Sequence, residues 1–214
     1  MQTISAVLYF LSHHPGWSFL LLVLFFGALY AVTKKLIFGI LTLLMPIANI
    51  FLAHMLNAWF LNAYGVKGTG IVTLISETSS TLNDNPIYDY DVLVKTPDGE
   101  DVLTGFSTMS AAIYPVRNAI LLPPTNEAFV LKYIPGYEKN IVVLSDESAY
   151  GLARIVHENK QLVEKARIQF EASRNNGRFK EEYKQALKTF IADPDNLSDD
   201  MALREYREVL HSLE

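Results

Sequence analysis

Long apolar runs fill the first third of the chain and predict two membrane-spanning helices. Residues 17–33 contain no Asp, Glu, Lys or Arg, and neither do residues 36–61. Each run meets the roughly 17 to 25 residues that a helix needs to cross about 30 Å of hydrocarbon. A single helix over both runs would be about 67 Å long, and Lys34 and Lys35 near its centre would each cost roughly 2.5 to 3.5 kcal/mol. We therefore expect two helices, about 17–33 and 36–61, in a membrane segment of residues 1–61.

Lys34 and Lys35 are the topology determinants, and they allow two arrangements. In the first, a helical hairpin turns at residues 33–35, the lysines lie at the cytoplasmic interface by the positive-inside rule, and the rest of the chain is periplasmic or extracellular. In the second, only the first helix spans, and the second lies along the inner surface or in a bundle, which leaves the rest in the cytoplasm. The hairpin is preferred because the first half of the second helix is apolar on all sides apart from Thr42, whereas an interfacial helix has a charged face. Its turn nevertheless lacks Gly, Pro or Asn at the tip.

The second apolar run carries a polar stripe. Thr42, Pro46, Asn49 and Asn57 fall within about 80° of one another on a wheel of 100° per residue, and His54 lies at the margin. Polar side chains in hydrocarbon seek partners, so the stripe is expected to face another helix, either in this chain or in another protomer. The functional alternative is a polar intramembrane site, such as a proton path around His54.

The middle of the chain alternates apolar and polar residues with the period of β-strands. In YDYDVLVKTPDGEDVLTGF, residues 88–95 alternate, and Asp98–Gly99 is expected to form a hairpin turn into a strand over 101–106. Further strands are expected over 71–75, 119–122, 128–134 and 141–144. About six short strands in roughly 80 residues are typical of a small β-barrel or sandwich, so residues 62–145 are predicted to form such an antiparallel domain.

Three motifs resemble functional sites but have simpler explanations. The glycines of GVKGTG precede a strand rather than a helix, so we expect a flexible linker and no phosphate-binding loop. Asp89 and Asp91, with Asp84 nearby, fall on the solvent face of a strand and lack both a general-acid partner and a calcium loop. His13 and His14 have no carboxylate partner, so they are expected in a polar loop rather than in a metal site.

The order of these segments also resembles that of a known kind of protein. An initial strand after a Gly-rich start is followed by IYDYDVLVKTPDGE, by YPVRNAILLPP and by FVLKYIPGYEKNIVVL. Over roughly residues 68–145 this is similar to the small soluble β-domain of uncharacterised bacterial inner-membrane proteins, in which a Tyr-x-Pro step precedes the last short strand. The resemblance implies a domain anchored in the bacterial inner (plasma) membrane, and it brings no catalytic motif and no functional residue. The long helical tail departs from the pattern.

Residues 146–214 show the rhythm of amphipathic helices. Apolar positions spaced alternately by three and four residues, with one asparagine among them, form a candidate helical seam: Ala149, Leu152, Val156, Asn159, Val163, Ala166 and Phe170. Such an asparagine typically fixes register at a cost in stability. A break with a C-cap is expected at 175–177, and Ser198 is expected to cap a third helix. The three helices are expected to pack on one another or on the β-domain, with a partner-binding seam as the alternative.

Composition excludes several classes of function. The chain has 18 Lys and Arg against 23 Asp and Glu, a net charge of −5 and no cysteine. No segment is basic enough for a nucleic-acid surface. The lack of cysteine excludes disulfides, thiol catalysis and cysteine-ligated zinc, and no cofactor is expected.

These observations favour a membrane-anchored α+β protein that presents surfaces rather than chemistry. His157 and His211, the histidines of the soluble part, both lie in the helical tail, and no pattern pairs a nucleophile with a base, so an enzyme is not expected. The expected function is a membrane-tethered protein-binding or scaffold subunit of a bacterial envelope complex. Its expected partners are the lipid bilayer and another membrane protein or a second copy of the chain. The alternative is a membrane-embedded regulator, transport accessory or immunity protein that uses the polar stripe, and an enzyme is the least favoured alternative.

Overall fold

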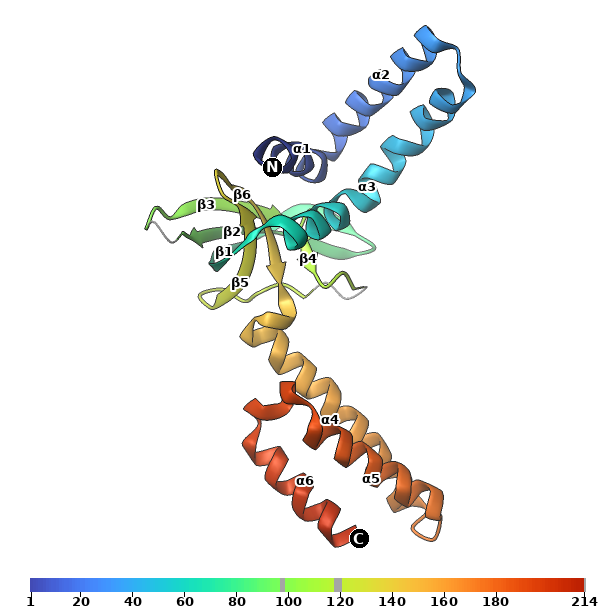
Figure 1. The fold of residues 1–214 in the computed structure, drawn as a ribbon, viewed down its shortest axis with the longest axis vertical. Coiled ribbons are helices and arrows are strands. Elements are labelled where there is room, and N and C mark those ends of the chain that lie inside the picture. The colour runs from blue at the N-terminus through green and yellow to red at the C-terminus, as the bar shows by residue number, and fades with distance from the viewer. Residues whose placement is uncertain (97–98, 118–120, 214) are drawn as a thin grey trace. The chain divides into compact units, whose positions relative to one another are not determined.

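The structure is a computed structural model that describes residues 1–96, 99–117 and 121–213. The chain is α+β, with two long apolar helices near its start, one six-stranded sheet and a set of C-terminal helices (Figure 1). It divides into two compact units, Met1–Ser148 and Ala149–Glu214. A hydrophobic cluster forms within each unit.

Three helices open the first unit: α1 (Gln2–His13), α2 (Pro15–Thr33) and α3 (Leu36–Tyr64). α2 and α3 lie side by side as an antiparallel hairpin (Figure 1), and both are long and apolar enough to cross a membrane. The hairpin turns at Lys34, whose backbone is left-handed (φ 55°) and whose N–H donates to the Tyr30 carbonyl at 2.8 Å. Lys34 thus reverses the chain in the conformation that glycine more commonly provides at a helix end.

α3 extends past the hairpin and packs on the sheet (Figure 1). From Leu36 to Leu52 most of its large apolar side chains are exposed, as on a helix with no protein around it. Beyond that point one face becomes buried, and Ala58 and Leu61 are fully enclosed. They pack in one cluster with sheet and loop residues, namely Ala112, Ile134, Val142 and Leu144. One helix therefore belongs both to the apolar hairpin and to the core of the sheet domain.

The sheet has six strands: β1 (Val66–Leu82), β2 (Asn85–Lys95), β3 (Val102–Ser107), β4 (Ile113–Tyr114), β5 (Ala128–Ile134) and β6 (Tyr137–Leu144). Their order is β3-β2-β1-β5-β6-β4, and every pair is antiparallel except β4 with β6. The expected antiparallel barrel or sandwich is therefore wrong: the sheet is single, mixed and open.

The sheet stays open because its two edge strands do not meet. The edges are β3 and β4, and β4 has only two residues because the next residue, Pro115, has no N–H to continue a ladder. β3 does approach β6, where the Thr104 hydroxyl donates to the Lys139 carbonyl at 2.6 Å. In the described part of the sheet this is a side-chain contact and not a pair of strands.

The expected flexible linker GVKGTG is also wrong, because Gly65 ends α3 and residues 66–70 form the start of β1. They pair with β5 in register from Val66 with Tyr133 to Ile71 with Ala128. A Cβ atom on Gly70 would lie 2.6 Å from the Phe129 ring. The glycine is needed here for close packing of β1 against that ring rather than for flexibility.

Two other sequence predictions fall partly outside the described residues. Asp98 of the predicted hairpin turn is outside them, while Gly99 is described and has a positive φ of 78°. Residues 119 and 120 of the strand predicted over 119–122 are also outside, and residues 121 and 122 have no regular structure.

The second unit contains α4 (Ala149–Ala172), α5 (Gly177–Ala192), a 3₁₀ turn η2 (Pro194–Ser198) and α6 (Asp200–Leu213). The three α-helices share one hydrophobic cluster, in which Leu187 is fully buried. Their number agrees with the prediction, since the seam spacing identifies helical faces by local periodicity.

The predicted caps of these helices need correction. The predicted break between α4 and α5 is present, but residues 175–177 do not cap the end of α4. Asn176 is instead the N-cap of α5, and its side chain accepts a hydrogen bond from the Arg178 N–H at 3.0 Å. Ser198 lies in η2, and Asp199 receives the Ala202 N–H at 3.1 Å at the start of α6. The cap lies one residue later than predicted because the 3₁₀ turn that begins at Pro194 includes Ser198.

Candidate functional site

The N-terminal part of the polar stripe, Thr42 and Asn49, makes contacts within the first unit. The Thr42 hydroxyl donates to the Phe38 carbonyl of its own helix at 2.8 Å. The Asn49 amide donates to the Leu11 carbonyl at 3.1 Å and to the Ser18 hydroxyl at 3.0 Å. Asn49 thus joins α3 to the point where α1 meets α2.

The C-terminal part of the stripe, Asn57, joins α3 to the sheet and to α1. The Asn57 amide donates to the Asn140 side-chain oxygen at 2.7 Å, and the Asn140 amide donates back at 2.9 Å. The Asn140 amide also donates to the carbonyl and the hydroxyl of Ser5, both at 3.0 Å. All three residues are fully buried, so every bond is made away from water. This Ser5–Asn57–Asn140 network fastens α1, α3 and β6 together.

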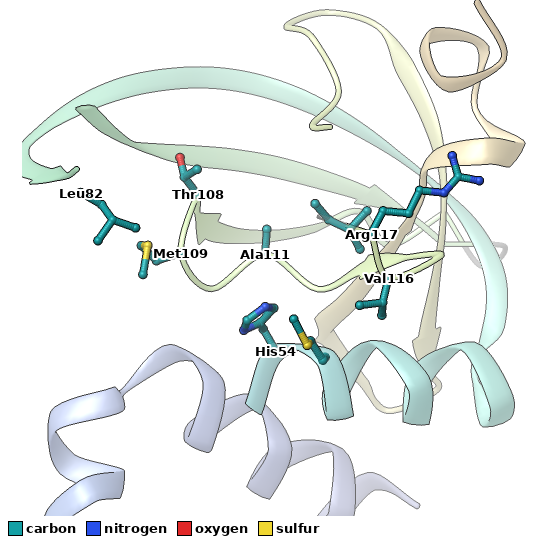
Figure 2. Close-up of a pocket in the computed structure, with 9 residues that line it drawn as sticks. His54, Leu82, Thr108, Met109, Ala111, Val116 and Arg117 are labelled. Atoms are coloured by element: carbon teal, nitrogen blue, oxygen red, sulfur yellow. The ribbon is translucent and has the colours of Figure 1, made fainter. Parts of the chain in front are cut away.

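His54 lines a cavity of about 200 Å³ between α3 and the sheet. Figure 2 shows His54 on α3 below the loop that carries Met109 and Ala111. The residues around the cavity are mostly apolar: His54, Met55, Leu82, Thr108, Met109, Ala111, Ile113, Val116 and Arg117. They come from α3, from the end of β1 and from the segment between β3 and the loop after β4. We call this space the junction cavity.

One charged side chain lines the junction cavity, and it is paired. Arg117 Nη2 lies 2.5 Å from Asp146 Oδ2. Asp146 also accepts a hydrogen bond from the Ser145 hydroxyl at 3.1 Å. Because the guanidinium charge is compensated by this carboxylate, the cavity suits an uncharged apolar group better than an anion.

His54 also lines a second, smaller cavity of about 100 Å³ beside α1. Its polar lining includes His13 and Asn49 together with serines of α1 and of the loop after β3. His13 Nδ1 lies 3.0 Å from the Tyr9 carbonyl, and the two rings stack with centroids 3.9 Å apart. Burial lowers the pKa of His13 below its ordinary value of 6.5, although the hydrogen bond to Tyr9 opposes the effect.

The structure places the two N-terminal histidines on either side of a helix boundary. His13 is the last residue of α1, and His14 lies between α1 and α2, so the polar loop expected here is a short break between helices. In the described ranges no group of three or more His, Cys, Asp and Glu is arranged to hold a metal ion.

The aspartates of β2 lie as the strand period places them. Asp89 and Asp91 are exposed, while Val92 and Val94 are fully buried. Asp84 is exposed in the tight turn between β1 and β2, with φ 63°. The three carboxylates therefore lie on the exposed side of a strand and in an exposed turn.

The candidate helical seam lies within the second unit. Val156, Val163 and Ala166 are buried in its cluster, and Phe170 packs against it, whereas Leu152 is half-buried outside it. The Asn159 amide donates to Asp193 Oδ2 and to Asn196 Oδ1, both at 3.1 Å. The asparagine thus joins α4 to η2 and to the residue that precedes it.

Sequence reasoning missed the partners that complete these sites. Ser5, Asn140 and the cavity-lining Arg117 were not singled out, because each looks unremarkable in its own segment. Lys34 and Lys35, which the sequence predicts to determine topology, are exposed at the tip of the hairpin. Comparison of this chain with protein families, with curated proteins and with solved structures finds no match.

Proposed function

We propose that this protein is a membrane-tethered protein-binding subunit of a bacterial envelope complex. In this proposal the α2–α3 hairpin is the anchor, the sheet is a platform and the helical unit presents a binding surface. The observation that carries the proposal is the continuity of α3, which runs from the exposed apolar hairpin into the core formed with Ala58 and Leu61. A platform built on the same helix as the anchor is held at a set distance from the bilayer.

The distribution of side chains along the hairpin supports insertion in a membrane. Trp17, near the start of α2, is 68% exposed, and Trp59, near the end of α3, is 60% exposed. Both lie toward the sheet end of the hairpin, whereas Lys34 and Lys35 lie at the opposite end. Exposed tryptophans at one end and lysines at the other match the two interfaces of a bilayer. By the positive-inside rule the lysines face the cytoplasm, which places the sheet and the helical unit outside it.

Labelling of an introduced cysteine tests this orientation. The chain has no cysteine, so Leu36→Cys, at a position 73% exposed beside the two lysines, provides a single thiol at the hairpin tip and keeps both charges. In intact cells a membrane-impermeant maleimide should leave it unlabelled, and labelling should appear after the membrane is permeabilised. Asp89→Cys on the exposed face of β2 is the matched control and should react in cells whose outer barrier alone is opened. The reverse pattern would place the sheet in the cytoplasm.

The surface of the second unit supports a role in protein binding. Several of its charged side chains pair along their own helices, as Arg167 does with Glu164 and Glu171, while Lys160 pairs with Asp199 from another element. Between these pairs the unit exposes large apolar side chains that its own core does not use: Leu162, Ile168, Leu197 and Met201. Apolar groups among charges that already have partners are typical of a surface that binds another protein.

Crosslinking in cells tests the binding role. We expect proteins crosslinked to the full chain to be lost when Leu197 and Met201 are both replaced by Asp. Leu103→Asp, at an exposed position on β3, is the control and should retain them. If removal of residues 149–214 leaves every partner bound, the binding surface is not on the helical unit.

The polar stripe supports an intramembrane regulator less well. Asn49 and Asn57 already use their amide donors within the chain. Thr42 and His54 can be replaced by Leu without touching those bonds. Loss of partner association in that double variant would favour a regulator, transport accessory or immunity protein over the tethered adaptor.

A further inference from the structure

We propose that the junction cavity holds an acyl chain of a phospholipid from the adjoining leaflet of the bilayer. The inference rests on the membrane insertion in the proposed function, and it adds a ligand that the binding role does not require. It assigns the cavity to lipid rather than to a substrate or to a segment of another protein.

The size and lining of the cavity fit part of an acyl chain. An apolar protein cavity of about 150 Å³ binds benzene, which has six carbon atoms. The junction cavity is about 200 Å³, so on the same scale it accepts on the order of eight methylene groups. A partner helix, about 10 to 12 Å across with its side chains, is too wide for this space. Buried Ala111 and half-buried Ile113 line the inner part with carbon atoms.

The position of the cavity places lipid beside it. His54 and Met55 line the cavity from α3, and Phe51, Leu52 and Leu56, within one turn of them, are exposed. Those exposed side chains continue the apolar surface that we assign to the bilayer. Two further apolar side chains line the cavity on the sheet side and are exposed at its edge, Leu82 to 48% and Met109 to 44%. A leaflet that covers the exposed part of α3 therefore also reaches the cavity.

The charges around the cavity favour the acyl chain over the headgroup. Arg117 is the charged lining residue, and Asp146 neutralises it at 2.5 Å. A bound phosphate would have to compete with that carboxylate, whereas an acyl chain needs no charge. Since phospholipid is also the most abundant source of acyl chains in a membrane, it is the occupant that mass action selects.

Binding of this kind is expected to be weak and exchanging. An acyl chain leaves one apolar environment for another when it enters the cavity, so burial from water does not drive the step. The high local concentration of lipid maintains the occupancy instead. The ligand should therefore be detected by covalent capture in the bilayer rather than by purification in detergent.

Photocrosslinking of the full chain in proteoliposomes tests the proposal. The probe is a phosphatidylcholine with a diazirine in one acyl chain, and adducts are mapped by mass spectrometry. We expect adducts on Ala111 and Ile113 in addition to those on the exposed faces of α2 and α3. Ala111→Leu, which fills the cavity, should lower the Ile113 adduct by roughly tenfold while adducts on α2 stay unchanged. Val116→Phe fills the cavity from another wall and serves if the first variant does not fold.

The possible results distinguish lipid bound in the junction cavity from lipid that only surrounds the α2–α3 hairpin. Leu103→Phe, at an exposed position outside the cavity, should leave all adducts unchanged. Adducts on α2 without any on Ala111 or Ile113 would overturn the lipid assignment and leave membrane insertion standing. The absence of adducts on α2 as well would overturn the insertion itself. A roughly tenfold preference for phosphatidylglycerol, or labelling by a photoreactive free fatty acid alone, would also contradict the proposed occupant.

Discussion

Asn57 and Asn140 exchange hydrogen bonds in a site that water does not reach. Replacing Asn140 by Ala removes one side of this exchange and also frees the Ser5 hydroxyl. We expect a loss of roughly 1 to 3 kcal/mol, because a buried polar group without a partner keeps its desolvation cost. The measurement is the free energy of local opening from hydrogen exchange of the α1 amides.

Asn85→Ala provides the matched control for this prediction. Asn85 is exposed, and its amide donates to the carbonyl of Asn83 two residues away. Its replacement should change the same free energy by less than about 0.5 kcal/mol. Equal effects of the two substitutions would mean that the buried network contributes nothing to the docking of α1.

His13 should make the docking of α1 sensitive to acid. Burial lowers its pKa in the folded chain below the ordinary 6.5, so the unfolded state binds the proton more readily. The stabilisation is therefore complete above about pH 6.5 and is lost as the pH falls through the lowered folded pKa. After correction for the slower intrinsic exchange at lower pH, the free energy of α1 opening from hydrogen exchange should decrease as the pH falls below about 6.5. His13→Gln should remove much of this dependence, and an unchanged pH profile in that variant would contradict the assignment.

At the scale of an element, α5 holds the second unit together through Leu187. This side chain is fully buried in the cluster shared by α4, α5 and α6. Leu187→Ala should destabilise the unit by roughly 2 to 5 kcal/mol, because it removes buried methyl groups and leaves a cavity. Leu162→Ala, at a position 63% exposed, should cost less than about 0.5 kcal/mol. Hydrogen exchange of α4 to α6 in the full chain measures both.

Elements with a strong local period were predictable from the sequence. The alternation that buries Val92 and Val94 and exposes Asp89 and Asp91 is visible in neighbouring residues. α1 was missed although Ile4, Val7, Leu8 and Leu11 have helical spacing. The two histidines before Pro15 favoured a polar loop instead.

Features that depend on distant residues were not predictable in this way. The difference between an open sheet and a barrel depends on whether edge strands meet, and no local period contains that information. The stripe was expected to face a helix, yet the main partner of Asn57 is on β6, 83 residues away. The junction cavity likewise joins α3 to segments that share no pattern with it. Its lining residues come together only in the folded chain, so no sequence pattern marks them.

At the scale of the whole molecule, the proposed membrane insertion gives the length of α2 a consequence for bilayer thickness. α2 has 19 residues, which gives a length of about 28 Å, slightly less than an average hydrocarbon core of about 30 Å. We expect the thermal stability of the first unit to be highest in bilayers of short-chain phosphatidylcholine and to decrease in thicker ones. Lengthening α2 by two leucines after Leu24 should move the optimum to thicker bilayers. The temperature of unfolding in proteoliposomes of graded chain length measures the shift.

The hydrogen bond between Ser5 and Asn140 also determines when α1 can dock during synthesis of the chain. The two residues are separated by 135 positions, and translation adds roughly 5 to 20 residues per second, so α1 waits roughly 7 to 27 s for its partner strand. In the proposed membrane-tethered form, the apolar hairpin leaves the ribosome during that interval, before β6 is made. Until β6 emerges, Ser5 of α1 lacks its Asn140 partner. Docking of α1 is thus one of the last steps in the folding of the first unit.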